Sequence, residues 1–420
     1  MNDKHPVAAA AALLLAAAAA LPAGAQTKED IEALRNEIRA LRAEIEALKR
    51  GAGAATVAPG NWGERIEQLE IKAKDAVVGG DIGGSFRLPG SETSIRIYGH
   101  AEAQAIHDLK ATAPGDDFTN LPEQPLDGSG FTKGKTKLTA QTSRFGFETS
   151  TPSSYGTFST KVEGDFYAYC GSECNRNRFR LRHAYGEYAG WLIGQTWSTF
   201  MDLDNLPETV DFNGPIGSPF SRRMMIRYTY ADPKAGQKFT FAAEDPEDGA
   251  RMPNLVARFD KSFDWGAVNV RLLGHEKRAG TETKRGYGVG LGGSYKLTGD
   301  DLLMAQWARV TGDYDMMYGS FGYNVDAAGK LRFDKVDGVV AGWAHTFSPQ
   351  LRSNVVLGFT RSKGDVSFDN KRLLQVHAGF VYVPVKNVEL GAEYIHGTRK
   401  TFDGDSGTMS RFDLMARYSF

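Results

Sequence analysis

The sequence predicts an all-β transmembrane barrel of sixteen antiparallel strands, preceded by a short N-terminal α-helical coiled coil. Three features point to this fold class: an alternating segment that ends on an aromatic residue, a rhythm of short and long connections, and a leader-like N-terminus. In residues 409–420, every second position is apolar, namely Phe412, Leu414, Ala416, Tyr418 and Phe420. Strand side chains alternate between two faces, so this segment has one apolar face. Such an ending is typical of barrels whose last strand pairs with the first.

Residues 1–25 are expected to be an export signal. A weakly basic start precedes an apolar run over residues 7–21, and Ala23-Gly24-Ala25 offers a small-x-small cleavage site. A membrane anchor is the alternative reading. It is disfavoured because the run is near the lower length limit of a spanning helix and is rich in alanine.

The composition fits either a soluble protein or a membrane barrel. The net charge of −1 and the mean hydropathy of −0.38 point to no particular partner, since a barrel hides its apolar band in every second residue. Cys170 and Cys174 are expected to form a local disulfide after export. A zinc site would need two more nearby ligands, and the histidines lack ligand spacing, so we expect neither a metal nor a cofactor.

Residues 26–50 are predicted to form a periplasmic coiled coil that assembles identical chains, followed by a linker over residues 51–93. Its apolar seam, spaced alternately by three and four residues, consists of Ile31, Leu34, Ile38, Leu41, Ile45 and Leu48. In a parallel assembly Glu37 can meet Arg42 of a neighbour. The seam alone nominally favours two strands, and an amphipathic helix packed on the barrel is the alternative.

Residues 94–420 are predicted to be the outer-membrane barrel. Seven short turns are predicted near residues 150–154, 189–190, 232–236, 260–265, 298–300, 348–349 and 384–387. Eight longer loops are predicted near residues 109–134, 169–176, 201–221, 245–253, 277–283, 312–335, 362–370 and 398–408. Fifteen connections give sixteen strands, with both barrel ends on the short-turn, periplasmic side. A soluble β-sandwich also alternates, but it does not account for the other features.

The chain resembles the DcaP-type trimeric outer-membrane porin family. The most specific stretch is residues 192–215, LIGQTWSTFMDLDNLPETVDFNGP, and the segment GGSFRLPGS at residues 83–91 supports it. The resemblance covers nearly the whole mature chain. It implies a homotrimer of sixteen-stranded barrels with periplasmic coiled coils, and uptake of dicarboxylates and other small anions.

A row of arginines carries the sharpest charge signal. Arg176, Arg178, Arg180 and Arg182 occupy alternate positions, so they are expected on one strand face, toward the lumen rather than lipid. Guanidiniums about 6.5–7 Å apart would form a track for carboxylates. Alternatively, Glu163 and Asp165 on the neighbouring strand neutralise them.

The third long loop is expected to narrow the barrel, as the resemblance implies. It supplies Asp202, Asp204, Glu208 and Asp211, and the returning wall supplies Arg222, Arg223 and Arg227. Acids opposite bases would create a transverse field that selects charged solutes. Alternatively, the acids only hold the loop against those arginines. Arg144 and Lys161 are weaker candidates for anion contacts, because a bulge near Arg144 would change its direction.

The sequence therefore predicts an outer-membrane diffusion channel for small anions, chiefly dicarboxylates, with lipid, solute and two further copies of the chain as partners. A nonselective porin and an adhesive barrel with a plugged lumen are the alternatives. Neither enzymatic activity nor nucleic-acid binding is expected. The chain has no Gly-x-Ser-x-Gly motif, Ser198 and His183 have no evident acidic partner, and the glycines of residues 288–293 suit small lumen-facing positions.

Overall fold

The computed structural model describes residues 78–110, 118–127, 134–168, 178–246, 250–279, 281–313, 315–317, 322–364 and 370–420. The predicted signal, the coiled-coil seam, Cys170, Cys174 and Arg176 lie outside these residues. The chain divides into two compact units. One consists of Met1–Ile97 and Phe147–Thr160, and the other of Tyr98–Gly146 and Lys161–Phe420.

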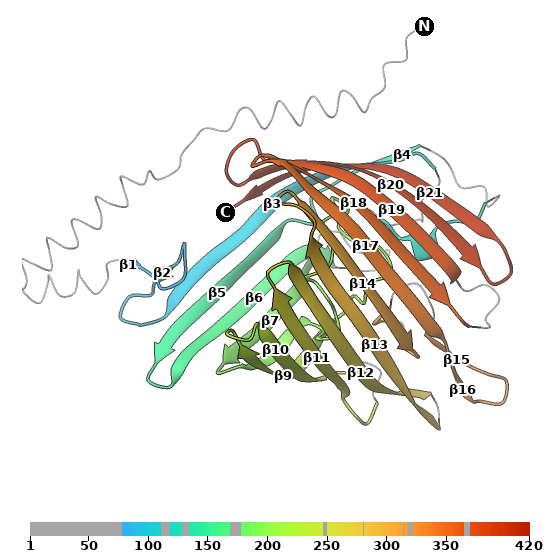
Figure 1. Ribbon diagram of the computed structural model, residues 1–420, viewed down its shortest axis with the longest axis horizontal. Coiled ribbons are helices and arrows are strands. Elements are labelled where there is room, and N and C mark those ends of the chain that lie inside the picture. The colour runs from blue at the N-terminus through green and yellow to red at the C-terminus, as the bar shows by residue number, and fades with distance from the viewer. Residues whose placement is uncertain are drawn as a thin grey trace, which may run out of the picture. The chain divides into compact units, whose positions relative to one another are not determined.

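Within the described residues, sixteen antiparallel strands form a closed barrel, as predicted (Figure 1). They are β3 (Ser94–Asp108), β5 (Arg144–Ser153), β6 (Gly156–Ala168), β7 (Arg178–Tyr188), β8 (Trp191–Trp197), β9 (Arg222–Asp232), β10 (Gln237–Glu244), β11 (Asn254–Phe263), β12 (Gly266–Ala279), β13 (Glu282–Lys296), β14 (Asp301–Thr311), β17 (Lys335–Ser348), β18 (Leu351–Ser362), β19 (Asn370–Tyr382), β20 (Val388–Thr401) and β21 (Ser406–Ser419). The seam that closes the barrel lies between β21 and β3, from Arg411 opposite Asp108 to Ser419 opposite His100. Beyond it, Phe420 and Gly99 exchange two backbone hydrogen bonds, with N···O distances of 3.0 and 3.2 Å.

The barrel strands have an apolar outer face and a polar inner face. In β12, Val268, Val270 and Leu272 are exposed, whereas Asn269 and Arg271 between them are buried. A soluble sheet buries its apolar face instead. Together with the closure, this inverted pattern excludes the soluble sandwich and matches a membrane barrel.

In the described part of the chain, no helix has both the length and the apolar character needed to cross a membrane.

The seven predicted short turns all join consecutive strands. The turn at Ala189 and Gly190 has two residues with positive φ, 49° and 84°, as tight hairpins require. Two predicted long loops are instead largely strand: β12 runs to Ala279 before β13 begins at Glu282, and β20 runs to Thr401 before β21 begins at Ser406. These strand ends were predicted as loops because both of their faces are polar. Strands that extend beyond the apolar band no longer need an apolar face.

Short elements occupy the ends and loops of the barrel. In the first unit, β1 (Val78–Gly79) pairs with β2 (Phe86–Arg87), so strands occur within the last part of the predicted linker. β4 (Lys135–Thr139) pairs with β3, and residues 140–143 interrupt the strand directly before β5 begins at Arg144. The 3-10 helix η1 (Leu121–Glu123) lies in the loop after β3.

The loop between β14 and β17 contains a small hairpin of β15 (Tyr323–Val325) and β16 (Leu331–Phe333). At its turn, hydrogen bonds from the Lys330 backbone and the Arg332 side chain lower the pKa of Asp326 below its usual range. Asp326 is therefore ionised at neutral pH and braces the turn.

A candidate pore constriction

The loop between β8 and β9, residues 198–221, packs against the polar inner face of the opposite wall. At its start, the Ser198 hydroxyl and the Thr199 backbone N–H donate to Glu244 of β10, both at 2.7 Å. Near its end, the Ile216 N–H donates to Gln375 of β19 at 3.1 Å. The loop thus contacts strands other than the two that it joins.

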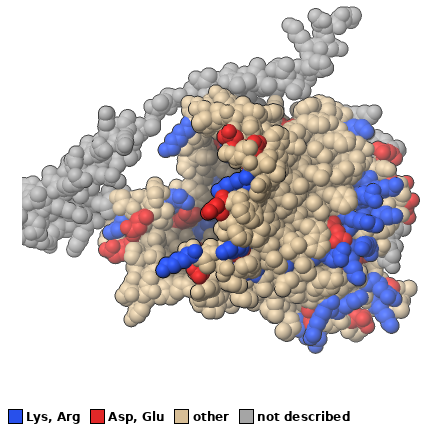
Figure 2. All heavy atoms as spheres, viewed as in Figure 1, with Lys and Arg blue, Asp and Glu red and all other residues tan. Residues whose placement is uncertain are grey.

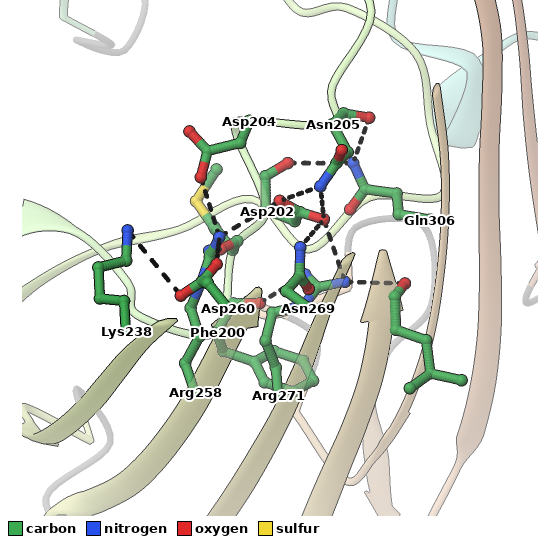
Figure 3. A network of polar contacts seen from close by, with 12 residues as sticks. Phe200, Asp202, Asp204, Asn205, Lys238, Arg258, Asp260, Asn269, Arg271 and Gln306 are labelled. Atoms are coloured by element: carbon green, nitrogen blue, oxygen red, sulfur yellow. Dashed lines mark hydrogen bonds and ion pairs between the residues drawn. The ribbon is translucent and has the colours of Figure 1, made fainter. Parts of the chain in front are cut away.

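Asp202 of this loop is bonded to several neighbouring side chains (Figure 3). Its fully buried carboxylate accepts hydrogen bonds from Asn269 at 2.7 Å and from Asn205 at 2.9 and 3.1 Å. Arg258 and Arg271 approach it at 3.5 and 3.8 Å. These contacts hold the loop against β11 and β12, since buried charges persist only when they are paired and hydrogen-bonded.

The main chain around Asp202 is fixed by the same wall. Arg258 donates to the Met201 carbonyl at 2.6 Å, Arg271 to the Phe200 carbonyl at 2.9 Å, and Gln306 of β14 to the Asp202 carbonyl at 3.1 Å. The Phe200 ring enters an apolar cluster formed with side chains of several strands and of the β14–β17 loop: Ala242, Val256, Leu273, Ala308, Val310, Met316, Met317 and Val336. Part of the barrel interior is therefore filled by packed side chains.

Further along the loop, Glu208 and Asp211 reach the strands on the other side of the barrel. Glu208 accepts two hydrogen bonds from Arg352 of β18, both at 2.7 Å. Asp211 accepts hydrogen bonds from the Thr119 N–H at 3.0 Å and the Thr119 hydroxyl at 2.6 Å. The carboxylate of Glu393 in β20 accepts a hydrogen bond from the Asp211 backbone N–H at 3.0 Å.

The loop acids do not face the arginines that the sequence placed opposite them. Arg223 is fully buried and pairs with Asp313 and Asp315, at 3.9 and 3.5 Å. Arg227 approaches Glu187 at 4.0 Å, and the Arg222 guanidinium lies 4.4 Å from the Trp197 ring centre. In the described residues the loop passes beyond β9, and its acids pair with arginines of β11, β12, β18 and β21 instead.

The arginine row of β7 is tied to two acids of β6. Arg180 donates to both Asp165 oxygens, at 2.9 and 2.7 Å, and Arg182 donates to the same carboxylate at 2.6 Å. Arg182 also lies 3.3 Å from Glu163, which Arg144 and Lys161 approach at 3.3 and 3.8 Å. The alternative in which wall acids neutralise the row is therefore realised for Arg180 and Arg182. Arg178 is exposed and has no ion pair within the described residues.

A second ladder of charges, which sequence reasoning missed, continues around the wall. Arg352 bridges Glu208 and Glu389, and Arg417 of β21 joins Glu389 at 3.1 Å to Glu102 of β3 at 2.6 Å. Arg417 was already visible on the polar face of the last strand. Its partner strands could not be identified without the register of the closed barrel.

The bases and acids of these ladders differ in exposure. The Arg180 side chain is 29% exposed over a fully buried Asp165, and the Arg417 side chain is 29% exposed over Glu102 at 1%. On the loop the order is reversed, because Asp204 is 71% exposed and its partner Arg258 only 10%. At these pairs the wall presents guanidinium groups and the loop presents a carboxylate, whereas in the Arg227–Glu187 pair the carboxylate is the more exposed partner, at 46% against 24%.

The described residues give little support to a catalytic or metal-binding role. Ser198 does have an acidic partner, Glu244, contrary to the sequence expectation, but that contact anchors the loop. His183 bonds Thr196 at 2.9 Å and lies 3.9 Å from Glu163. No group of three or more metal-ligating side chains in the described part of the chain is placed to hold a metal ion.

Comparisons with solved structures identify barrels of the same kind. The crystal structure of the outer membrane channel DcaP of Acinetobacter baumannii is 29% identical and has a TM-score of 0.72. The match covers 78% of this chain and 97% of that chain. An anion-selective porin from Comamonas acidovorans (13% identical, TM-score 0.55, 78% and 100% covered) and the trimer form of OmpT from Vibrio cholerae (13% identical, TM-score 0.51, 78% and 99% covered) share the fold. No curated protein sequence matches significantly.

The family model described as DcaP outer membrane protein matches residues 84–420. This range spans every barrel strand, the loop after β8 and both charge ladders. The chain therefore belongs to the DcaP outer membrane protein family and is an outer-membrane channel of the porin type.

Proposed function

We propose that this porin is a passive diffusion channel that prefers small anions, dicarboxylates above all. The observation that carries the proposal is the difference in exposure within the wall ion pairs. Where a guanidinium is exposed and its carboxylate lies beneath it, a solute meets the positive partner first. Exposed guanidiniums can each bind a carboxylate through two hydrogen bonds.

The solute contacts that we propose are Arg178, Arg180, Arg222 and Arg227, with Arg144 and Lys161 as weaker candidates and with Arg352 and Arg417 added by the second ladder. The burial of Arg182 and Arg223 argues against solute contacts by these two side chains, and we assign Arg223 to bracing the β14–β17 loop. The distance of about 6.5–7 Å between alternate residues of a strand favours dicarboxylates, because two neighbouring arginines at that distance could hold the two carboxylates of one solute.

We also propose that the loop after β8 forms the constriction. Asp204 and Glu208 are its exposed acids, whereas Asp202 and Asp211 anchor it. Exposed acids on the loop and exposed bases on the wall would create a transverse field, which orients charged solutes and opposes poorly matched ones.

The assembly that we propose is a homotrimer. The heptad seam of residues 31–48 would join three chains in the periplasm after removal of residues 1–25, and Cys170 and Cys174 would form a disulfide in a loop. The trimer form of OmpT supports this assembly only through its shared fold.

Single-channel recording tests the solute preference. Current through the purified protein is measured in a planar bilayer while succinate or propionate is added at equal concentrations. We expect concentration-dependent block by succinate at concentrations where propionate has little effect, because succinate can contact two guanidiniums. Equal effects of both solutes would contradict the dicarboxylate preference, and the absence of conductance would favour the plugged barrel.

A further inference from the structure

The outer face of the barrel carries a row of cations at the long-loop ends of β18, β19 and β20. Arg361 lies directly opposite Arg372, and Arg372 lies directly opposite Lys400, in the antiparallel registers of these strands. All three side chains are exposed. Alternation along the strands places them on the same outward face as the exposed apolar residues Leu357 and Leu374.

The row has no counter-charge of its own. Like charges directly opposite each other destabilise a sheet, and within the described residues no ion pair or hydrogen bond joins these three side chains to another group. The acid opposite Arg361 is Asp337, and both of its oxygens accept hydrogen bonds from Arg309, at 2.8 and 2.9 Å. A cationic row of this kind favours an anionic partner from outside the chain.

The position of the row indicates where that partner comes from. In outer-membrane barrels the longer loops are extracellular, so the row lies at the outer edge of the apolar band. Phe359 and Leu374 pair with each other directly below it and continue the apolar face. Figure 2 shows Lys and Arg side chains gathered at the end of the barrel that carries β15 and β16. Basic side chains at a membrane surface attract anionic lipid headgroups.

We propose that Arg361, Arg372 and Lys400 bind the phosphate of an outer-leaflet lipid, whose acyl chains lie along the apolar strand faces below. The phosphate oxygens would accept charge-assisted hydrogen bonds from neighbouring strands and thereby relieve the repulsion within the row. The row faces away from the lumen, so this lipid site is independent of the solute preference proposed above.

Native mass spectrometry of the purified full chain tests the site, with dioleoyl phosphatidic acid as the probe and phosphatidylcholine as the reference lipid. The test variant is R361Q/R372Q/K400Q. The matched control is K234Q/K296Q/K386Q, which removes three exposed positive charges from the short-turn side. We expect bound phosphatidic acid to fall at least about tenfold in the test variant and to remain in the control.

Equal lipid occupancy in the test variant and the wild type would overturn the proposal, as would an equal loss in the control. Displacement of the lipid by inorganic phosphate at the same concentration would assign the row to free phosphate and would also overturn it. Single-channel conductance of the test variant verifies that its barrel is folded. Because block by succinate is measured separately, failure of the solute preference can be distinguished from failure of this lipid site.

Discussion

On β13, the inner wall has glycines at positions where the loop after β8 lies against it. A Cβ added at Gly292 would overlap an Asp202 carboxylate oxygen, and one added at Gly288 would lie 2.8 Å from the Phe200 ring. The glycines of residues 288–293 were predicted as small lumen-facing positions, and the loop explains why no larger side chain fits at these two.

We expect Gly292→Ala to displace the Asp202 carboxylate and loosen the loop, at a cost of roughly 1–3 kcal/mol for overpacking. The measurement is single-channel conductance, which should become noisier and shift in mean value. Gly299→Ala is the matched control, because a Cβ there meets nothing within 4 Å. Identical recordings from the two variants would show that Gly292 does not support the loop.

At the scale of the element, two acids of the loop that are only two residues apart have different roles: one anchors the loop and the other is exposed. Asp202 is fully buried among Asn205, Asn269 and two arginines, whereas Asp204 is mostly exposed. The sequence identified all four loop acids but could not distinguish their roles. Burial depends on which wall strands the loop reaches, and the wall residues that receive it come from later strands.

We expect Asp202→Asn to release the loop, because Arg271 would keep a buried charge without its carboxylate, at a cost of roughly 3–5 kcal/mol. Protease accessibility of residues 198–221 should increase. Asp204→Asn should leave accessibility unchanged and make the channel more anion-selective. Equal proteolysis of both variants would contradict the division of roles.

At the scale of the whole molecule, alternation and turn signals were sufficient to predict sixteen strands and their closure. The pattern failed at the outer ends of β12, β13, β20 and β21, where both faces are polar. It also could not supply the register between distant strands, and so it missed Arg352 as a partner of the loop and Arg417 as a partner of β3. Strand identity is local, whereas the pore lining depends on contacts across the barrel.

The seam provides a test of closure. Deleting Phe420 removes two backbone hydrogen bonds to Gly99 and should lower the free energy of unfolding by about 1–3 kcal/mol. Urea unfolding in lipid vesicles measures this loss. Phe420→Leu, which keeps the backbone groups and an apolar side chain, should unfold close to the wild type. A deletion variant as stable as Phe420→Leu would mean that the terminal bonds do not stabilise the barrel.

The central claim is that exposed wall guanidiniums make the pore anion-preferring, and reversal potential tests it most directly. In a tenfold KCl gradient, complete selectivity corresponds to a reversal potential of about 59 mV. We expect the reversal potential of the wild type to have the sign that indicates anion selectivity. R180Q/R417Q should move the reversal potential toward zero, whereas R180K/R417K, which keeps both charges, should stay near the wild type. A cation-selective wild type, or a folded R180Q/R417Q channel with an unchanged reversal potential, would contradict the account.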